Sequence, residues 1–415
     1  MYLTHLSLTN FRNYARLDRD MPRGPLLLVA GNAQGKTSLL EAVYFLATFV
    51  SFHATNDRQL INLPASAESL AVARIQAAFQ YQQEDESKAN SSTHRLEARI
   101  IQEENGGNGG LRVRKEILLD GVKRKSSEVI GKFNAVMFLP QMLRIVEGSP
   151  EERRRYINLA LAQAIPYYAP TLSTYSQVLS QRNALLKQLS ERRNDPHSAA
   201  AQLGFWDEQL AIAGAHLIYS RIHAIQELER LAAQIHRELT RNQEVMRLVY
   251  QPSFEPLPTR PGQYLLPLST SVDRGGLSIE KIQVSFQDCL FRMRGEEITR
   301  GVTTIGPHRD ELRFLGNGID LGIFGSRGQA RTAVLALKLA EVVWLKEKTG
   351  HWPVLLLDEV LAELDPIRRV DLLSRLLTSE QTLVTTTDLD QFSEEFLRTA
   401  TIWNIQEGQI SEGKA

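Results

Sequence analysis

One glycine-rich segment carries the residue types best suited to binding a phosphate group. It reads Gly31-Asn32-Ala33-Gln34-Gly35-Lys36-Thr37, and Ser38 follows it. In such a loop, backbone N–H groups and the start of the next helix bind phosphate oxygens. The Lys36 ammonium would reach the β- and γ-phosphates of a nucleotide and act in catalysis, and the Thr37 hydroxyl would bind Mg²⁺. The pattern predicts a P-loop in which Gly31–Ser38 bind ATP.

One position departs from the usual form of this loop. Five residues before Gly35, where a P-loop normally has its first glycine, the chain has Ala30. Alanine serves there as long as its φ is negative, because only a positive φ makes a side chain costly. The prediction of a P-loop therefore includes a negative φ at Ala30.

A second motif lies about 320 residues downstream, where an apolar run, Leu355–Leu357, ends in Asp358 and Glu359. An apolar strand with this ending is typical of a Walker B motif. The Asp358 carboxylate would hold Mg²⁺, and Glu359 would be the catalytic base that accepts a proton from the attacking water. The Walker B motif is a weak signal alone, but together with the P-loop it predicts a site that binds and hydrolyses ATP.

A third motif follows the order found in ABC-type ATPases. It reads Phe324-Gly325-Ser326-Arg327-Gly328-Gln329, directly before an expected helix at Ala330–Trp344. In an ABC signature motif, the serine hydroxyl and the helix N–H groups bind the γ-phosphate held by the other subunit. We therefore expect Ser326, Gly328 and Gln329 to bind nucleotide. The alternative is that Ser326 only caps the helix.

Three single residues stand at other positions where ABC-type ATPases contact the nucleotide. Asp365 belongs to a segment that resembles a D-loop, which crosses the dimer interface in this class. Thr387 follows a strand where a histidine is usual, and its hydroxyl would sense the γ-phosphate. Gln141 stands where a Q-loop glutamine would bind the nucleotide and its Mg²⁺. The alternative for Gln141 is an exposed polar cap.

The motifs need an α/β framework to position them. Leu26–Val29, Val354–Leu357 and Thr382–Thr386 read as short buried strands, and helices are expected from Lys36 and over Ile367–Leu377. Residues 70–125 alternate as in an antiparallel meander. An apolar stripe from Leu203 to Leu239 predicts about 60 Å of helix, a protruding arm. Two helices broken near Gly214 are the alternative.

The predicted fold class is therefore α/β: an ABC-type P-loop ATPase head built from both chain ends, with an inserted antiparallel β part and a helical second lobe or short arm. We expect residues 1–150 to form the N-terminal part of the head, with the P-loop and the meander. Residues 151–278 would form the helical lobe. Residues 279–415 would form the C-terminal part of the head, with the signature and Walker B motifs.

Composition narrows the class of protein further. The chain has 415 residues, 43% hydrophobic and 23% charged, which excludes wholesale disorder. A single cysteine excludes an internal disulfide and a cysteine-based metal cluster, and fits a reducing compartment. No apolar stretch approaches the roughly 20 residues that span a bilayer, and no signal peptide is visible. We expect a cytoplasmic protein.

In order along the chain, these motifs resemble the RecF family of SMC-like, ABC-type ATPases. The strings that carry the resemblance are Asn10-Phe11-Arg12-Asn13-Tyr14, Gly31–Ala42, Gly148-Ser149-Pro150, Arg153-Arg154-Arg155, Gln181–Lys187, Gly306-Pro307-His308-Arg309-Asp310 and Phe324–Thr332. Arg327 and Ala330 stand where the family has glutamines, and Gln141 stands where it has an acidic residue. For His308 and Arg309 we expect a structural turn with a buried ion pair.

The resemblance implies a function. Members of this family bind ATP, form homodimers around it and hold double-stranded DNA, including gapped DNA. With RecO and RecR they assist the loading of RecA during recombinational and replication-gap repair. They hydrolyse ATP slowly, as weak DNA-dependent ATPases, and hydrolysis opens the dimer. The resemblance also places Arg12 and Asn13 near the nucleotide.

Binding to DNA would need a local basic surface, because 48 basic and 48 acidic residues give a net charge of zero. One candidate is a cluster around an expected hairpin at Leu118–Gly121, with Lys123, Arg124 and Lys125 at its centre. The whole cluster is Arg112, Arg114, Lys115, Lys123, Arg124, Lys125 and Lys132, against Glu116, Asp120 and Glu128. Arg153, Arg154 and Arg155 form a second candidate. The alternative is a solvated hairpin and a helix start.

Two other functions remain open at this stage. A nucleotide-binding subunit of an ABC-type transporter would share the ATPase motifs, but it would have a shorter insertion, a signature nearer Leu-Ser-Gly-Gly-Gln and a histidine in place of Thr387. A non-hydrolysing ATP-dependent DNA clamp would need no catalytic base, whereas Glu359 is present. ATPase activity and ATP-dependent dimer mass would separate these alternatives.

Overall fold

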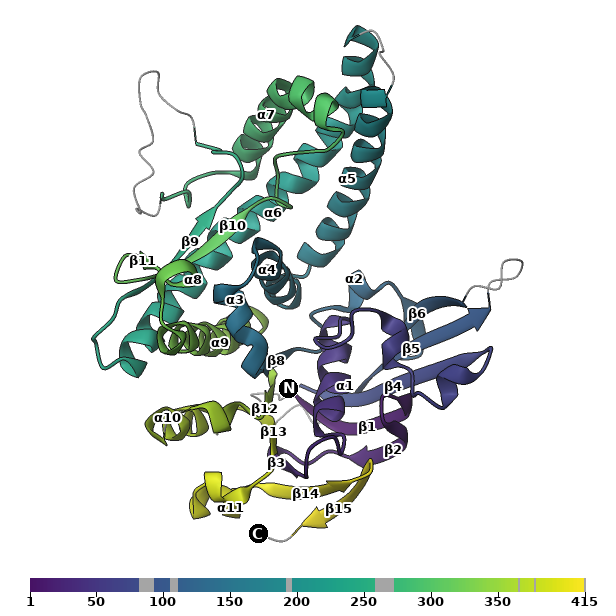
Figure 1. Ribbon diagram of the computed structural model, residues 1–415, viewed down its shortest axis with the longest axis vertical. Coiled ribbons are helices and arrows are strands. Elements are labelled where there is room, and N and C mark those ends of the chain that lie inside the picture. Colours follow the sequence, from purple (N-terminus) through teal and green to yellow (C-terminus); the bar gives the residue numbers. More distant parts are fainter. Residues whose placement is uncertain are drawn as a thin grey trace, which may run out of the picture. The chain divides into compact units, whose positions relative to one another are not determined.

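The computed structural model describes residues 1–81, 93–104, 111–191, 196–257, 272–364, 366–376 and 378–413. Its contacts divide the chain into two compact units, residues 1–142 with 341–415 and residues 143–340 (Figure 1). Residues 279–340 thus cluster with the second unit, whereas the sequence interpretation groups them with the C-terminal part of the head. The division of the chain into residues 1–150, 151–278 and 279–415 remains a prediction.

The first unit contains two sheets. The antiparallel sheet has the order β2-β1-β4-β5-β6-β7. Its strands are β1 (Tyr2–Phe11), β2 (Tyr14–Asp20), β4 (Ala71–Gln80), β5 (His94–Glu104), β6 (Leu111–Leu119) and β7 (Val122–Arg124). The meander expected over residues 70–125 is confirmed in β4 to β7, and the β6–β7 turn falls at Asp120–Gly121, both with positive φ.

The second sheet joins the two ends of the chain. Its order is β15-β14-β3-β13-β12-β8, with β3 paired in parallel to both β13 and β14. The strands are β3 (Gly24–Val29), β8 (Ala135–Phe138), β12 (Val354–Asp358), β13 (Gln381–Thr386), β14 (Thr401–Gln406) and β15 (Gln409–Gly413). The P-loop strand and the Walker B strand therefore lie in one sheet with β13 between them, as the predicted head requires.

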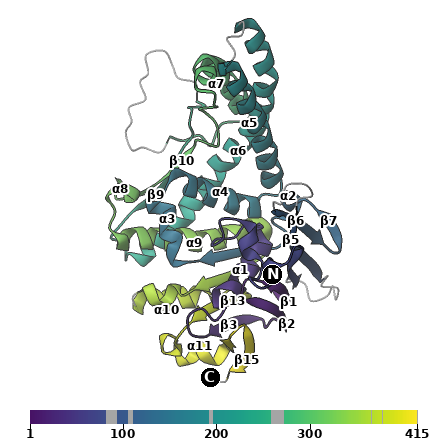
Figure 2. The same ribbon diagram turned by 45° about the vertical axis from the view of Figure 1, so that its right-hand side comes forward.

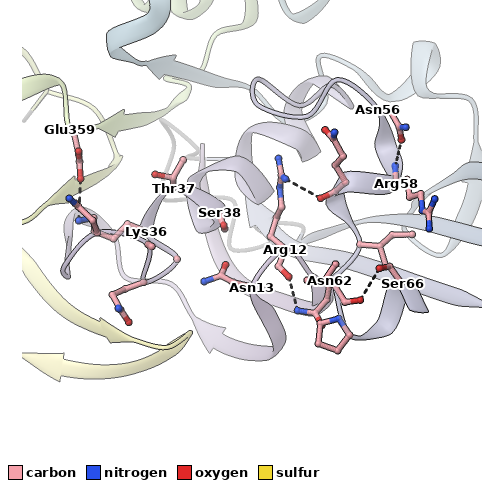
Figure 3. Close-up of a pocket in the computed structure, with 18 residues that line it drawn as sticks. Arg12, Asn13, Lys36, Thr37, Ser38, Asn56, Arg58, Asn62, Ser66 and Glu359 are labelled. Atoms are coloured by element: carbon pink, nitrogen blue, oxygen red, sulfur yellow. Dashed lines mark hydrogen bonds and ion pairs between the residues drawn. The ribbon is translucent and has the colours of Figure 1, made fainter. Parts of the chain in front are cut away.

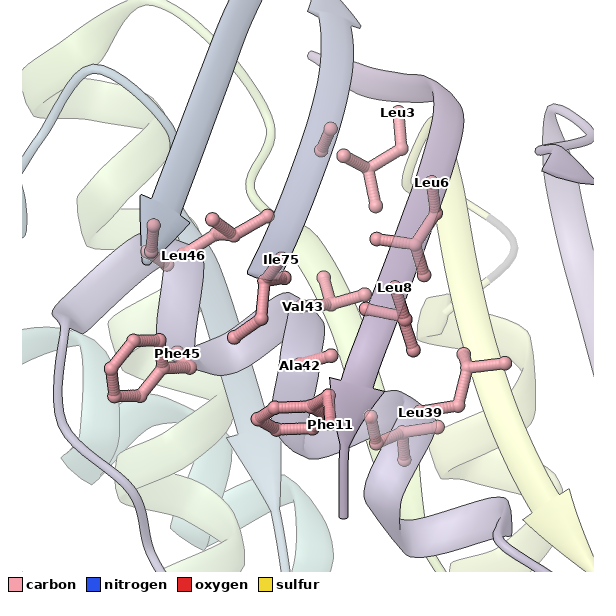
Figure 4. Packing of buried hydrophobic residues seen from close by; sticks show 14 of the residues in the cluster. Leu3, Leu6, Leu8, Phe11, Leu39, Ala42, Val43, Phe45, Leu46 and Ile75 are labelled. Atoms are coloured by element: carbon pink, nitrogen blue, oxygen red, sulfur yellow. The ribbon is translucent and has the colours of Figure 1, made fainter. Parts of the chain in front are cut away.

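Helix α1 (Lys36–Thr48) supplies the centre of this unit's core. Its residues Leu39, Ala42, Val43, Phe45 and Leu46 are buried. They pack against strands β1 and β4, whose alternate residues point inward, as Figure 4 shows for Leu6, Leu8 and Ile75. This packing fixes the start of α1, where the P-loop ends.

The remaining short elements in or at the edge of the first unit are α2 (Ser126–Val129), α10 (Pro366–Leu376), α11 (Glu394–Thr399) and the 3₁₀ turns η1 (Asp57–Leu60), η2 (Ala65–Ala67), η3 (Pro140–Leu143), η4 (Val360–Glu363) and η5 (Leu389–Gln391).

The second unit is mainly helical. Its helices are α3 (Arg144–Glu147), α4 (Pro150–Ala164), α5 (Tyr168–Glu191), α6 (Pro196–Leu239), α7 (Ile279–Arg300), α8 (Leu321–Phe324) and α9 (Arg327–Thr349), the last of which continues into the first unit. A small sheet has the order β11-β10-β9, from β9 (Met246–Gln251), β10 (Glu311–Gly316) and β11 (Ile319–Asp320).

The long helix expected up to Leu239 is confirmed, because α6 runs unbroken for 44 residues. It does not project alone, however: it packs against α5, α7 and β9, and the three helices lie side by side in both views (Figures 1 and 2). Gly214 permits this packing, since a β-carbon there would lie 2.5 Å from the ring of Phe286. The expected arm is therefore part of a packed helical lobe. Gly214 lies at a close contact between helices, and the helix does not break there.

Buried ion pairs explain two of the strings noted in the sequence. Arg182, from Gln181–Lys187, is fully buried and pairs with Asp207 and Glu297, at 2.7 Å each. In the Gly306–Asp310 turn the buried pair is made by Asp310 with Arg221, at 2.8 Å. Breaking a buried pair leaves an uncompensated charge, so both pairs specify how the helices fit together.

The other residues of the turn have different surroundings. His308 bonds to the Tyr175 hydroxyl at 2.8 Å, and burial lowers the pKa of His308 to about 4, so that it is neutral at pH 7. Gly306 has φ +121, and a β-carbon there would lie 2.5 Å from the Tyr175 hydroxyl. The structural turn expected from the sequence is present, but Arg309 is exposed and is not a member of the buried pair.

Among the helices that the structure describes, none is long and apolar enough to span a membrane.

Candidate nucleotide-binding site

The P-loop lies between the end of β3 and the start of α1. Ala33 has φ +63 and Gly35 has φ +111. A β-carbon on Gly35 would lie 2.5 Å from the Asn13 side-chain nitrogen and 3.0 Å from the Tyr14 hydroxyl, so this position requires glycine. Ala30 is not among the described residues with a positive φ, as its place in the motif demands.

The loop opens onto a pocket of about 940 Å³, which is at the upper end of the range for ligand sites. Its described lining comes entirely from the first unit and is mostly polar (Figure 3). The lining residues are Arg12, Asn13, Asn32, Ala33, Gln34, Gly35, Lys36, Thr37, Ser38, Asn56, Arg58, Gln59, Ile61, Asn62, Leu63, Pro64, Ser66 and Glu359. The structure thus brings together most of the P-loop, Arg12, Asn13 and the expected catalytic base.

The Lys36 side chain lies inside the P-loop and is held there by hydrogen bonds. Its side chain is 4% exposed, and its ammonium donates to the carbonyl oxygens of Ala30, at 2.6 Å, and Gly31, at 3.3 Å. The same nitrogen lies 3.2 Å from Oε1 of Glu359, which is half-exposed (Figure 3). An anion entering the pocket would therefore meet a preformed cation.

A second cluster of oxygen atoms surrounds Asp358. The Thr37 hydroxyl donates to both carboxylate oxygens of Asp358, at 3.0 and 2.9 Å, and the Thr385 hydroxyl donates to Oδ1 at 2.8 Å. Burial raises the pKa of Asp358, and these two hydroxyl groups act in the opposite direction. The Thr37–Asp358 contact agrees with the sequence analysis, which assigns both residues to one Mg²⁺ site. Thr385 is not among the predicted site residues. Its hydroxyl also accepts a hydrogen bond from the Glu359 backbone N–H at 3.0 Å.

One wall of the pocket was not expected from the sequence. It is built by the turns η1 and η2 and the residues around them, from Asn56 to Ser66. Backbone hydrogen bonds attach this segment to the end of β1: the Arg12 N–H donates to Leu60 and the Asn62 N–H donates to Asn10. No local pattern in the sequence signals a contact of this kind.

Several expected site residues lie elsewhere. Gln141 is exposed in η3 and Thr387 is exposed after β13, and neither lines the pocket. Asp365 lies outside the described residues. Thr387 and Gln141 have sequence positions typical of nucleotide contacts, but the structure does not bring them to this pocket.

The signature segment lies in the second unit and caps a helix. The Ser326 hydroxyl accepts from the Gln329 N–H at 3.2 Å, and the Gln329 side chain accepts from the Ser326 N–H at 3.0 Å. This reciprocal pair is a capping box at the start of α9, so Ser326 caps the helix. Binding of nucleotide by Ser326 and Gln329 stays a prediction. Gly328 lies in the first turn of the same helix.

The first basic cluster is partly neutralised. Lys115 pairs with Asp57 at 3.1 Å, and Arg114 lies between Glu103 and Glu116. Lys123 also pairs with Glu116, at 2.6 Å, although its side chain is 67% exposed. Arg124 and Lys125 are exposed. Arg112 and Lys132 are exposed as well, so the surface that remains for an anionic partner includes both of them along with residues 123–125.

The second basic cluster is smaller than the sequence indicates. Arg153 forms a two-point ion pair with Glu311, at 2.6 and 2.7 Å, and donates to the Gly148 carbonyl at 2.7 Å. This arginine is paired within the fold, so less of its charge is available to DNA than the sequence indicates. Arg154 donates to the Asp310 carbonyl at 2.9 Å and is partly buried, while Arg155 is exposed.

Comparison with known proteins defines the class first. The family model for the RecF/RecN/SMC N terminal domain matches residues 2–410. DNA replication and repair protein RecF from Chloroflexus aggregans is 38% identical over 417 residues, with 100% of both chains covered. RecF from Herpetosiphon aurantiacus is 39% identical with 99% of both chains covered, and RecF from Bacillus subtilis is 34% identical with 99% of this chain and 100% of its own covered. The chain belongs to the RecF family of DNA replication and repair proteins.

Solved structures agree with this family. The recombination mediator protein RecF-ATP in the RecFOR pathway superposes with a TM-score of 0.80, at 26% identity, over 99% of this chain and 97% of its own. Its RecF-ATPrS counterpart gives a TM-score of 0.79 at 27% identity, over 99% and 98%. The Smc head domain from Pyrococcus furiosus, at 16% identity and a TM-score of 0.50, shares the fold. The ABC-type ATPase head expected from the sequence is thereby confirmed.

Proposed function

We propose that this chain is a cytoplasmic, ATP-dependent double-stranded DNA-binding protein of recombinational and replication-gap repair. It forms a homodimer on ATP, binds duplex and gapped DNA, hydrolyses ATP slowly and assists RecA loading with RecO and RecR. The observation that carries the proposal is the pocket that Lys36 and Thr37 line at the end of the P-loop, with the Thr37 hydroxyl bonded to the Asp358 carboxylate behind it. Membership of the RecF family over the full chain supports the biological role.

The residues of the pocket fit an ATP molecule with its Mg²⁺. The loop offers backbone N–H groups and the Lys36 ammonium to phosphate oxygens. Thr37 and Asp358 offer oxygen ligands, which Mg²⁺ prefers. A bound cation would also compensate the buried Asp358 carboxylate, and it would neutralise charge on the phosphates. Gln141 is exposed in η3, and its binding to Mg²⁺ stays a prediction from the sequence.

Glu359 has the geometry of a base at this site. Its backbone is fixed by the hydrogen bond to Thr385, while its carboxylate is half-exposed beside Lys36. Nucleotide phosphates compete with Glu359 for the ammonium, so nucleotide binding would free the carboxylate to accept a proton from water. This supports slow hydrolysis over the alternative of a non-hydrolysing clamp. Family membership sets aside the transporter alternative.

If ATP binding drives dimerisation through the signature segment, a substitution at Ser326 should prevent the dimer from forming. We expect Ser326→Arg to leave ATP binding by the monomer unchanged and to prevent the ATP-dependent doubling of mass, because a large cation would stand where the partner's nucleotide must dock. Light scattering with and without ATP measures this. Asp320→Ala, which removes the cap of the neighbouring helix α8 and a 3.9 Å ion pair with Arg313, is the control. Loss of ATP binding in monomeric Ser326→Arg would show that the segment acts within its own chain.

Binding to DNA gives a second prediction. Changing Lys123, Arg124 and Lys125 together to alanine should weaken duplex binding severalfold or more and leave ATP affinity unchanged. Contacts would be to phosphates, so each lost contact should reduce the slope of log affinity against log salt concentration by about 0.9. Arg300→Ala with Arg398→Ala, two exposed arginines in surface pairs, controls for the loss of two of the three positive charges. An unchanged salt slope in the triple variant would move the DNA site elsewhere, with Arg154 and Arg155 tested next.

The proposed function is tested by two measurements on the wild-type protein. ATPase rate is measured with and without duplex DNA, and mass is measured with and without ATP. We expect a slow rate that rises with DNA and a mass that doubles with ATP. Tight ATP binding with no hydrolysis under either condition would favour the non-hydrolysing clamp, and no ATP binding at all would overturn the proposal.

A further inference from the structure

A buried carboxylate lies behind the pocket, and it has no role in the site as described so far. Glu41, in the second turn of α1, is 2% exposed. Its carboxylate accepts from Arg12 Nε at 2.7 Å and Arg12 Nη2 at 2.8 Å, and also accepts from the Ser51 hydroxyl. Ser51 in turn accepts from the His53 and Ala54 N–H groups. Glu41 is thus the centre of a network that joins β1, α1 and the loop after α1.

The backbone of Arg12 is constrained as firmly as its side chain. Its φ is +51, a region that a residue with a β-carbon rarely adopts. The surrounding structure holds it there, because the Arg12 N–H donates to Leu60 at 2.9 Å and its carbonyl accepts from Asn62 at 2.6 Å. An unfavourable conformation that is anchored on both sides of a pocket residue points to a functional requirement.

The contacts of the guanidinium leave two of its N–H groups available. Nε and one N–H of Nη2 face Glu41, and one N–H of Nη1 faces the Gln59 carbonyl at 3.0 Å. Two of the five N–H groups of the guanidinium therefore take no part in these contacts. The Arg12 side chain is 22% exposed and lines the pocket. Figure 3 shows Arg12 on the far side of Thr37 and Ser38 from Lys36. The two cations thus lie at separate places in one pocket.

We propose that Glu41 is a positioning residue for Arg12, and that it holds the two uncommitted N–H groups of the guanidinium toward an anionic group of the bound nucleotide. The inference rests on the proposed function, because it requires ATP in this pocket. Without the carboxylate, the arginine side chain would have to lose its own rotamer freedom when nucleotide binds. Glu41 therefore acts on ligand affinity through Arg12 and never touches the ligand.

A double-mutant cycle tests this role. ATP affinity and thermal unfolding are measured for wild type, Glu41→Gln, Arg12→Ala and the double variant. We expect Glu41→Gln and Arg12→Ala each to weaken ATP binding about tenfold, the effect of one charge-assisted hydrogen bond. In the double variant the loss should equal that of Arg12→Ala alone, because Glu41 has no other route to the ligand.

A matched control separates positioning from stability. Glu97 is a carboxylate of similar burial that also pairs with arginines, Arg74 and Arg99, but outside the pocket. Glu97→Gln should lower the unfolding temperature and leave ATP affinity unchanged. The inference is overturned if Glu41→Gln behaves like this control, or if the losses in the double variant multiply. Failure of wild type to bind ATP would instead overturn the proposed function.

Discussion

Lys36→Met should lose tight ATP binding, with affinity reduced by more than about a hundredfold. The Lys36 ammonium is nearly buried and already held at the mouth of the loop by two backbone carbonyl groups. A preorganised cation of this kind stabilises phosphate charge without the cost of rearranging, and loss of one such contact costs about 3 kcal/mol or more. Isothermal titration with ATP and Mg²⁺ measures the effect.

The chain offers a matched control for this variant. Lys115 also donates to a backbone carbonyl, that of Phe49 at 3.1 Å, and pairs with a carboxylate, Asp57 at 3.1 Å, but it does not line the pocket. Lys115→Met should therefore bind ATP as wild type does. Unchanged ATP affinity in Lys36→Met would show that this loop does not bind the nucleotide phosphates as a P-loop does.

Glu359→Gln should bind ATP and dimerise, yet hydrolyse ATP at least about a hundredfold more slowly than wild type. The amide keeps the size and hydrogen-bonding reach of the side chain but cannot accept a proton from water, and general-base catalysis contributes about a hundredfold or more. Lys36 keeps its two carbonyl partners in this variant, so the loop should stay intact. Single-turnover hydrolysis and the lifetime of the dimer are the readouts.

Glu407→Gln is the control for a lost charge near the loop. Glu407 contacts Gln34 through its backbone N–H, at 2.7 Å, so its carboxylate is not part of that contact. We expect wild-type hydrolysis from this variant and a longer-lived ATP dimer from Glu359→Gln alone. A wild-type rate in Glu359→Gln would exclude this residue as the base.

The parts of the site that the sequence predicts are those encoded by contiguous residues. A P-loop is a strand, a loop and a helix in succession, so Lys36 and Thr37 are positioned by their immediate neighbours. Asp358 is distant in sequence, but parallel strands end at one edge of a sheet, and only β13 separates β12 from β3. These rules of local geometry suffice for the Thr37–Asp358 contact.

The remaining features depend on contacts that no local pattern encodes. The Asn56–Ser66 wall joins the pocket through hydrogen bonds to β1, and the strand register decides which basic residues face an acidic one. Arg112 stands opposite Glu103 on β5, and Glu116 stands opposite Arg99, so a count of charges along one strand overstates its positive surface. The pairing of Glu41 with Arg12 is likewise visible only in three dimensions.

In the proposed function, nucleotide binding in this pocket controls binding to DNA. The most direct test is a titration of labelled gapped and intact duplex DNA with wild-type protein, at fixed salt concentration, with and without ATP and Mg²⁺. We predict that ATP tightens binding of wild type to both DNAs and leaves that of Lys36→Met unchanged. Equal DNA affinity with and without ATP, in wild-type protein that titration shows to be saturated with ATP, would contradict the account.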